Sequence, residues 1–360
     1  MANRDRLVET LIDLIRIDSP TGEEDEIDRE VTSRLQNLGF EVRHDNYQNL
    51  IATLDGSGEP LMLSAHLDTV EPGRGIRPHL DGDVLRSDGT TILGGDCKAG
   101  VAIVLEALTA VVESGASHVP VEVVFSRAEE GGLNGARNLD FSLIGARRGV
   151  VFDGEGPVNR VTVSAPAQNV VKAEITGRAS HAGLEPENGI SALVIAGHLL
   201  TRLPLGRIDE ETTSNIGYLE GGLKRNIIPE RAFLDGEIRS RDQQKLDHYT
   251  DSFRRVFSEV GKMYPEARID LDITNTYQSY RVEPEHPTLA MLSRALAEVG
   301  LEPMLGGSGG GSDANVFFEH GIAALPVGIG VRSFHTREET ALIPEVLQGA
   351  EMCEKLMLST

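Results

Sequence analysis

The sequence predicts an α/β protein: a mixed, mostly parallel sheet flanked by helices, with the chain interrupted by a second, α+β domain. Short apolar runs typical of buried strands, such as PLMLSAH and VPVEVVF, alternate with helical patterns in the first part of the chain. From about residue 167 the order of predicted elements changes to β-α-β-β-α-β, the split ferredoxin-like arrangement. The length of 360 residues also favours two domains, at about 150 residues per domain.

The first domain opens with an amphipathic pattern rather than with the apolar core of a signal peptide. Thr21 and Glu24 match a capping box before the apolar stripe that begins at Ile27. The remaining predicted elements are one almost wholly apolar helix over 99–112 and four strands near 49–54, 61–66, 120–126 and 149–153.

The inserted domain is predicted to span residues 167–281. Its elements are a strand over 169–177, a helix over 188–203, strands over 214–220 and 231–239, a helix over 242–262 and a strand over 267–274. After Pro287 the chain resumes with a helix near 288–299. We therefore expect residues 1–166 and 282–360 to form one domain, and the insert to form a lid.

Composition narrows the class of protein. The net charge of −22 repels phosphate backbones and anionic lipid, which argues against nucleic-acid and membrane partners. Two cysteines, Cys97 and Cys353, give no disulfide framework and favour a reducing compartment. No stretch has the roughly 18 apolar residues needed to cross a bilayer. These features agree with a soluble, cytoplasmic protein.

Two histidines and five carboxylates form the candidate site. They sit at or just after short apolar runs, where open α/β sheets place their chemistry. They are His66, Asp68, Asp96, Glu129, Glu130, Asp153 and His335. Singly, each has an ordinary explanation as a hydrogen-bonded histidine, a turn residue, a strand cap or a solvated acid. Together, in this strand context, they predict a two-metal hydrolase site.

The spacings within the motifs indicate a different role for each residue. Residues two apart in a strand share a face, so Asp68 can hold the imidazole of His66 while that ring binds metal. Glu129 and Glu130 diverge, so one can bind metal while the other acts as general base. Asp96 can bridge two metals roughly 3.5–4 Å apart, which gives each metal three ligands and suits zinc.

Seven motifs carry a resemblance to a known family: HLDTV, GGDCKAG, AEEGG, VFDGEG, RASHAG, GGGSDANVF and HTREE. In this order they resemble the co-catalytic zinc family that contains peptidase T, carboxypeptidase G and acetylornithine deacetylase. GGGSDANVFFEHGI followed by HTREE most resembles the peptidase T-like branch. The resemblance covers essentially the full length of the chain.

The resemblance implies a role for each residue. It implies two zinc ions per subunit, with cobalt or manganese as possible substitutes, held by His66, Asp96 and Asp153 and by Asp96, Glu130 and His335. Asp68 matches the family's histidine-orienting acid, and Glu129 matches its general base. Cys97 stands where many relatives have Asp or Asn, which leaves open whether its thiol binds metal.

Three residues of the inserted domain are candidates for substrate contact. His181 could donate to the oxyanion of a tetrahedral intermediate, or it could be a local cap. The planar guanidinium of Arg239 could hold a carboxylate, or Arg239 could be a surface charge. The resemblance implies that His181 and Asn226 reach a substrate in the active site of a partner subunit, and thus a homodimer.

The glycine run 306–311 allows two interpretations. Gly309-x-Gly311 followed by Ala314 matches a dinucleotide fingerprint, but no acid stands about 20 residues on, where Val331 and Arg332 lie. Close backbone approach to a substrate is the better explanation for Gly309 and Gly310, because glycine lacks Cβ. The resemblance implies the same use.

These observations predict metal-assisted hydrolysis of an amide bond. The expected substrate is a short peptide that loses its N-terminal residue, as in an aminopeptidase or tripeptidase. An N-acyl-amino-acid deacylase is the alternative, because the same site would cleave that amide. A metal-binding protein without activity is disfavoured by the presence of Glu129 and Asp68. A nucleotide-dependent oxidoreductase has the least support.

Overall fold

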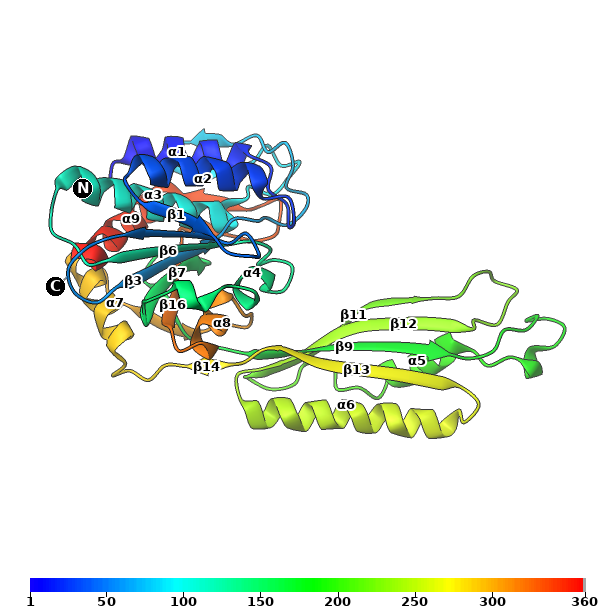
Figure 1. Ribbon diagram of the computed structural model, residues 1–360. Coiled ribbons are helices and arrows are strands. Elements are labelled where there is room, and N and C mark those ends of the chain that lie inside the picture. Colours follow the sequence, from blue (N-terminus) through cyan, green and yellow to red (C-terminus); the bar gives the residue numbers. More distant parts are fainter. Residues whose placement is uncertain (359–360) are drawn as a thin grey trace. The chain divides into compact units, whose positions relative to one another are not determined.

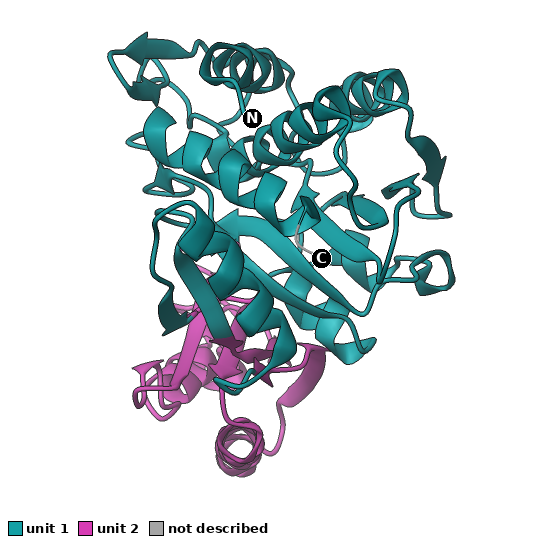
Figure 2. Cartoon of the chain, turned by 90° about the vertical axis from the view of Figure 1, so that its left-hand side faces the viewer, with its two compact units in different colours: residues 1–163, 282–307, 312–360 teal, residues 164–281, 308–311 magenta. Residues whose placement is uncertain are grey.

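The computed structural model describes residues 1–358, which form two compact units (Figure 2). The first unit comprises residues 1–163, residues 282–307 and the chain from residue 312 onward. The second unit comprises residues 164–281, together with the loop 308–311. Across residues 1–358, no helix combines the length and the apolar character needed to cross a membrane.

A mixed sheet forms the centre of the first unit. Its strands are β1 (Glu41–His44), β2 (Leu50–Leu54), β3 (Leu61–His66), β6 (Val121–Ser126), β7 (Arg148–Gly154), β8 (Arg160–Ala165), β15 (Met304–Gly307) and β16 (Ala323–Gly328). They follow the order β1-β2-β6-β3-β7-β16-β8, with β15 also paired to β8 (Figure 1). The central strands β6, β3, β7 and β16 run parallel. Every residue of β3 is buried, as expected for a strand covered on both faces.

Helices flank this sheet. They are α1 (Arg4–Arg16), α2 (Asp25–Asn37), α3 (Gly95–Ser114), α4 (Asn134–Arg137), α7 (Pro287–Glu298), α8 (Asp313–Glu319) and α9 (Ile343–Leu358), with a 3₁₀ turn at Phe141–Leu143. α3 is buried along most of its length because it lies between α1 and α9 on one side and β3 and β7 on the other. This explains its almost wholly apolar sequence. The predicted mixed, mostly parallel sheet with flanking helices is confirmed.

The predicted capping box at the start of α2 is wrong. The helix begins at Asp25, and Glu24 occupies the N-cap position without a side-chain capping bond. The hydroxyl of Thr21 instead donates to Asp68 Oδ2 at 2.7 Å. The carboxylate of Glu24 accepts the N–H of Ala128 at 3.0 Å. Both side chains make long-range contacts in place of the two capping bonds, and Glu24 also accepts the N–H of Gly22 at 2.9 Å.

A second, smaller antiparallel sheet belongs to the first unit. Its strands are β4 (His79–Asp81), β5 (Val84–Arg86), β17 (Val331–Arg332) and β18 (Thr340–Leu342), in the order β17-β18-β5-β4. β4 and β5 form a hairpin whose turn contains Gly82 at φ 62°, a left-handed conformation that favours glycine. The sheet holds the segment between β17 and β18, which carries His335, beside this hairpin.

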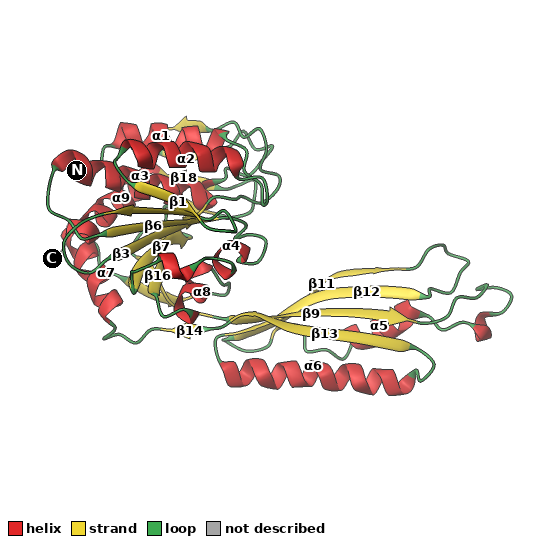
Figure 3. Ribbon diagram, in the orientation of Figure 1, coloured by secondary structure: helices red, strands yellow, loops and turns green. Residues whose placement is uncertain are grey.

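The second unit is an antiparallel sheet with two helices (Figure 3). Its elements are β9 (Ala167–Thr176), a 3₁₀ turn (Pro186–Asn188), α5 (Ala192–Leu200), β10 (Gly206–Arg207), β11 (Thr212–Gly221), β12 (Arg231–Ser240), α6 (Gln243–Met263), β13 (Arg268–Tyr277) and β14 (Tyr280–Arg281). The sheet order is β10-β11-β12-β9-β13. Alternate residues of β9, among them Val171 and Ile175, form one core with Ile195 of α5 and Phe253 of α6. The predicted ferredoxin-like α+β arrangement is confirmed.

A candidate metal centre at the carboxyl edge of the parallel sheet

The chain topology brings the candidate residues of the first unit to one edge of its sheet. His66 is the last residue of β3, Asp153 lies near the end of β7, and Glu129 and Glu130 follow β6. These three strands are parallel, so their carboxyl ends meet at the same edge. Asp96 lies in the first turn of α3. The backbone at Asp96 is not helical, with φ −80° and ψ 107°, so the regular part of the helix begins after this residue.

The carboxylate of Asp96 lies between two histidines. Its Oδ1 is 3.2 Å from His66 Nε2, and its Oδ2 is 3.1 Å from His335 Nε2. Each histidine also faces a second carboxylate: His66 Nε2 is 3.6 Å from Asp153 Oδ1, and His335 Nε2 is 2.8 Å from Glu130 Oε1. Two sets of nitrogen and oxygen donors therefore share one carboxylate.

The donor atoms are close enough to surround cations. Ligand atoms of Asp96, Glu130 and His335 lie within 4.8 Å of one another, and so do those of His66, Asp96 and Asp153. Hydrogen bonds to Asp96 and Glu130 raise the pKa of His335 to about 10, and burial raises the pKa of Asp153 to about 7. The histidine and carboxylate donors of the centre suit zinc.

Asp68 connects the histidine to the loop that carries the two glutamates. His66 Nδ1 lies 2.9 Å from the backbone oxygen of Asp68 and 3.4 Å from its Oδ1. The same carboxylate accepts the backbone N–H groups of Glu129 at 2.9 Å and Glu130 at 3.2 Å, in addition to the hydroxyl of Thr21. Asp68 is fully buried, and its contacts connect the ring of His66, the loop of Glu129 and Glu130, and Thr21.

Glu129 is a buried acid on a strained loop. Burial, with the charge of Asp153 as the next contribution, raises the pKa of Glu129 well above its usual range. The preceding residue, Ala128, has φ 50°, a left-handed conformation that costs a non-glycine residue free energy. Glu24 accepts the N–H of Ala128 and pairs with Arg127 at 3.0 Å, which holds this conformation. Thr21 and Glu24 are therefore site residues that the sequence did not reveal as such.

The second acid of the HTREE motif, Glu339, supports the backbone at Asp96. Glu339 is buried, and its two carboxylate oxygens accept the N–H groups of Gly94 at 2.8 Å and Asp96 at 2.9 Å. Burial raises the pKa of Glu339 to about 7. His335 itself has φ 64°, so its ring is presented from a strained backbone. Sequence analysis did not single out Glu339, although it stands four residues after His335.

Two further buried groups border the centre. The hydroxyl of Ser126 donates to Asp313 Oδ2, and burial raises the pKa of Asp313 to about 6. The thiol of Cys97 donates to the backbone oxygen of Phe152 at 2.7 Å, while its sulfur lies within 4.8 Å of the His66 and Asp153 ligand atoms. A thiol that donates a hydrogen bond is protonated, which is the form that does not bind metal.

The second unit separates its five candidate residues into two groups. His181 forms a bridge with Ile227, and the N–H of Ala182 donates to Asn226 O at 3.0 Å. Arg239 donates to Glu237 at 2.8 Å, and a Cβ added to Gly310 would lie 3.5 Å from its guanidinium, whereas Gly309 faces open space. The first group precedes β12 and the second lies near its end.

The separation of these groups follows from strand geometry. Asn226 precedes the first residue of β12, and Arg239 is its ninth residue. Eight steps of about 3.3 Å place Arg239 roughly 26 Å along the strand from Arg231, and Asn226 lies before Arg231 in the chain. Arg239 is paired with Gln168 at the start of β9, whereas His181 follows the end of β9. His181 and Arg239 therefore lie toward opposite ends of the same sheet.

The chain is similar to known proteins in sequence and in structure. Residues 62–359 match the model of the peptidase family M20/M25/M40. The uncharacterized protein YqjE of Bacillus subtilis is 37% identical over 98% of this chain and 97% of its own. The crystal structure of aminopeptidase PepT from Bacillus cereus has a TM-score of 0.89 and 35% identity, over 99% of this chain and 98% of that one. A tripeptidase from Staphylococcus aureus has a TM-score of 0.91 and 32% identity, over the same shares.

Proposed function

The chain belongs to the peptidase family M20/M25/M40, and from this premise we propose that it is a peptidase T-like metallo-aminopeptidase that releases the N-terminal residue of short peptides. The peptidase T-like resemblance seen in the sequence is confirmed by these matches. One observation carries the proposal: a single carboxylate, that of Asp96, faces two histidines, each with a second acid beside it.

The donor set fits two zinc ions. His66, Asp96 and Asp153 would hold one ion, and Asp96, Glu130 and His335 the other, with Co²⁺ or Mn²⁺ as substitutes. When bound, such ions polarise the scissile carbonyl and lower the pKa of a water molecule. Asp68 orients the ring of His66 and, through the N–H groups of Glu129 and Glu130, sets the position of the glutamate loop.

Glu129 is the proposed proton carrier. Its burial favours the protonated acid, so a proton accepted from the attacking water can be kept and then given to the leaving amine. Its neighbour Glu130 lies 2.8 Å from His335 and is used as a ligand, so the two adjacent acids do different work. Carboxylate oxygens of both acids lie within 4.8 Å of each other and of a ring nitrogen of His66, so both face the same centre.

Substrate contacts are assigned to the second unit. Arg239, with Gly309 and Gly310 beside it, would bind the free C-terminal carboxylate of the peptide. His181 and Asn226 would bind the scissile carbonyl side. A tripeptide spans only about 10 Å, so it cannot contact both groups of one chain, which a strand segment of roughly 26 Å separates. We therefore assign His181 and Asn226 to the active site of a partner subunit.

A homodimer through the second unit follows from this assignment. β11 is the outermost long strand on its side of the sheet: β12 pairs with one of its edges, and among residues 1–358 only the short strand β10 pairs with the other, at Thr213 and Ser214. Beyond that point the edge and its surroundings expose apolar side chains, namely Tyr218, Leu219, Leu223 and Phe233. Such an edge is suited to pairing with a second copy. A cytoplasmic location fits the two free, buried cysteines.

A hydrolysis screen of the zinc-loaded protein tests the proposal. Unblocked di- and tripeptides should be cleaved from the amino end. C-terminal amidation or Arg239→Ala should each cost roughly 2–5 kcal/mol in kcat/KM through loss of a charge pair. Arg231→Ala is the matched control, since Arg231 is an exposed arginine on the same strand. Higher kcat/KM for N-acetyl amino acids than for every free peptide would replace the peptidase by the deacylase.

A further inference from the structure

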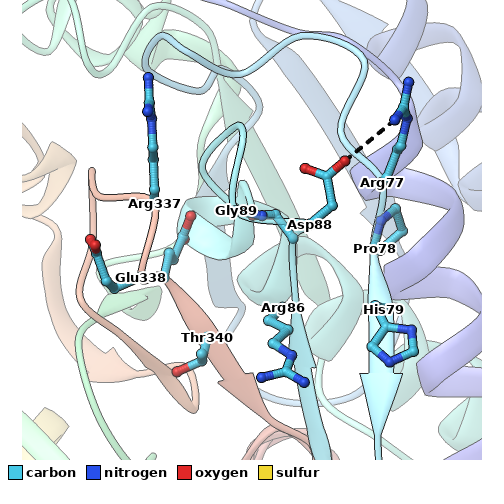
Figure 4. A pocket seen from close by; sticks show the side chains of 11 residues that line it. Arg77, Pro78, His79, Arg86, Asp88, Gly89, Arg337, Glu338 and Thr340 are labelled. Carbon is cyan, nitrogen blue, oxygen red and sulfur yellow. Dashed lines mark hydrogen bonds and ion pairs between the residues drawn. The ribbon is translucent and has the colours of Figure 1, made fainter.

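A pocket of about 760 Å³ lies beside the metal centre in the first unit. We call it the hairpin pocket. The β4–β5 hairpin and the segments before and after it form one side, with Arg77, Arg86 and Asp88, and the segment after His335 forms the other, with Arg337 and Glu338 (Figure 4). Nothing in the proposed mechanism uses it. Its volume exceeds that of an amino-acid side chain and is within the range of small-ligand sites.

The pocket gathers cations in a strongly acidic chain. Three arginines line it together with three acids, Asp88, Glu338 and Glu339, whereas the protein as a whole carries a net charge of −22. Arg77 makes a long contact of 3.5 Å with Asp88, and Arg86 contacts Asp81 at 3.1 Å. For Arg337 no carboxylate lies within ion-pair distance among residues 1–358. Figure 4 shows Arg337 and Arg77 extending from opposite sides of the pocket in the same direction.

One wall of the pocket is bonded to the metal centre. Glu339 lines the pocket, yet both of its carboxylate oxygens are engaged by the N–H groups of Gly94 and Asp96. Glu339 is therefore not available to pair with Arg337. The segment that carries Arg337 begins two residues after His335, the proposed ligand. A group bound at Arg337 would thus lie near Glu339, which holds the backbone at Asp96.

We propose that the hairpin pocket binds a carboxylate, with Arg337 as its main contact. The guanidinium of arginine matches a carboxylate in shape and binds it through two parallel hydrogen bonds. The carboxylate can belong to an acidic side chain at the N-terminus of a bound peptide, or to a free acidic amino acid. The first source rests on the proposed function, and it makes the enzyme selective for peptides that begin with an acidic residue.

The test compares isosteric ligands that differ in charge. We expect kcat/KM of the zinc-loaded enzyme to be about 10-fold higher for Asp-Ala-Ala than for Asn-Ala-Ala, as one charge-assisted contact provides. Arg337→Gln should bring this ratio close to one, and Arg337→Lys should restore part of it. Arg43→Gln is the control, because Arg43 is an exposed arginine on β1 that pairs with Glu41; it should leave the ratio unchanged.

A second arm separates the two sources of carboxylate. Free aspartate and asparagine are tested as inhibitors of Asn-Ala-Ala hydrolysis. Stronger inhibition by aspartate that disappears in Arg337→Gln supports the pocket with the free amino acid as its ligand, even if the two peptides are cleaved equally. Equal cleavage of both peptides together with equal inhibition by both amino acids overturns the inference while the peptidase stands. If no peptide is hydrolysed at all, the proposed function fails instead, and aspartate binding by calorimetry to wild type and Arg337→Gln then decides the pocket.

Discussion

The two units of the molecule arrange their candidate residues in opposite ways. In the first unit, donors from β3, β7, the start of α3 and the loop after β6 lie within 4.8 Å of one another in each ligand set. In the second unit, His181 and Asn226 are separated from Arg239 by most of the length of β12. The difference comes from strand direction. Parallel strands bring their carboxyl ends to one edge, whereas antiparallel strands place successive ends at opposite edges.

This contrast has a functional consequence. The first unit can assemble all its metal donors from one chain, but in the second unit a strand segment of about 26 Å separates the two groups. A peptide of two or three residues can use both kinds of group only when a second chain supplies one of them. Two questions can therefore be tested: whether one chain supplies all metal donors of the first unit, and whether a substrate contacts groups of the second unit from two different chains.

The largest effect is expected from Asp96→Ala, which removes the carboxylate that faces both histidines. Two metal equivalents should be weakened together, and activity should fall by roughly 10³-fold or more, because both donor sets lose a member. Glu130→Ala is the comparison, since it should chiefly weaken one equivalent. Metal analysis after equilibrium dialysis measures this. Two tightly held zinc ions in Asp96→Ala would refute the bridging role.

The next largest effect is expected from Glu129→Gln. The substitution keeps the size of the side chain but removes its basic form, so kcat should fall by at least about 10²-fold. Both metals should be retained, because Glu130, and not Glu129, faces His335 at 2.8 Å. Metal content and single-turnover rates check the two statements separately. Near-normal turnover in a metal-replete sample would show that another group takes the proton.

The sequence was sufficient to predict the architecture and the edge at which the donors meet. Predicted strands near 61–66 and 120–126 match β3 and β6 closely, because buried parallel strands leave continuous apolar runs. The ferredoxin-like order was predicted from the element sequence alone. Other elements carried weaker signals: the β4–β5 hairpin has strands of three residues each, and α9 was not anticipated.

The contacts that support the site could not be predicted in this way. Thr21 and Glu24 have the spacing of a capping box. Nothing in the local sequence reveals that Thr21 donates to Asp68 and that Glu24 accepts from Ala128 instead. The bond from Glu339 to the N–H of Asp96 spans 243 residues of sequence. Such contacts depend on the packing of distant segments. The roles of the predicted ligands and of His181, Asn226 and Arg239 stay predictions until they are measured.

If His181 acts in the active site of a partner subunit, two inactive variants should complement each other. His181→Ala and Glu129→Gln subunits are each expected to be inactive for different reasons. Equal mixing should give mixed dimers in which one site carries both wild-type residues, so about one site in four should be active. Activity of the mixture against each variant alone measures this. No recovery, despite subunit exchange demonstrated by mass spectrometry of labelled chains, would favour action of His181 within its own chain.

The smallest effect is expected from Thr21→Val, which asks whether the segment before α2 belongs to the metal centre. Valine keeps the shape of threonine but cannot donate to Asp68, whose carboxylate also holds the N–H groups of Glu129 and Glu130. We expect kcat to fall by about 10-fold, in the range for loss of a group that orients a ligand, while KM and bound metal change little.

Controls for Thr21→Val separate positioning of the loop from general stability. Thr21→Ser restores the donor and should recover most of kcat, whereas Thr109→Val removes a hydroxyl that donates to Leu105 O within α3, away from the glutamate loop. Both valine variants should lower the free energy of unfolding by about 1 kcal/mol, as expected for one hydrogen bond. Only Thr21→Val should lower kcat, because only Thr21 holds Asp68. An equal loss of kcat in Thr109→Val would show that stability, and not the position of the glutamate loop, is being measured.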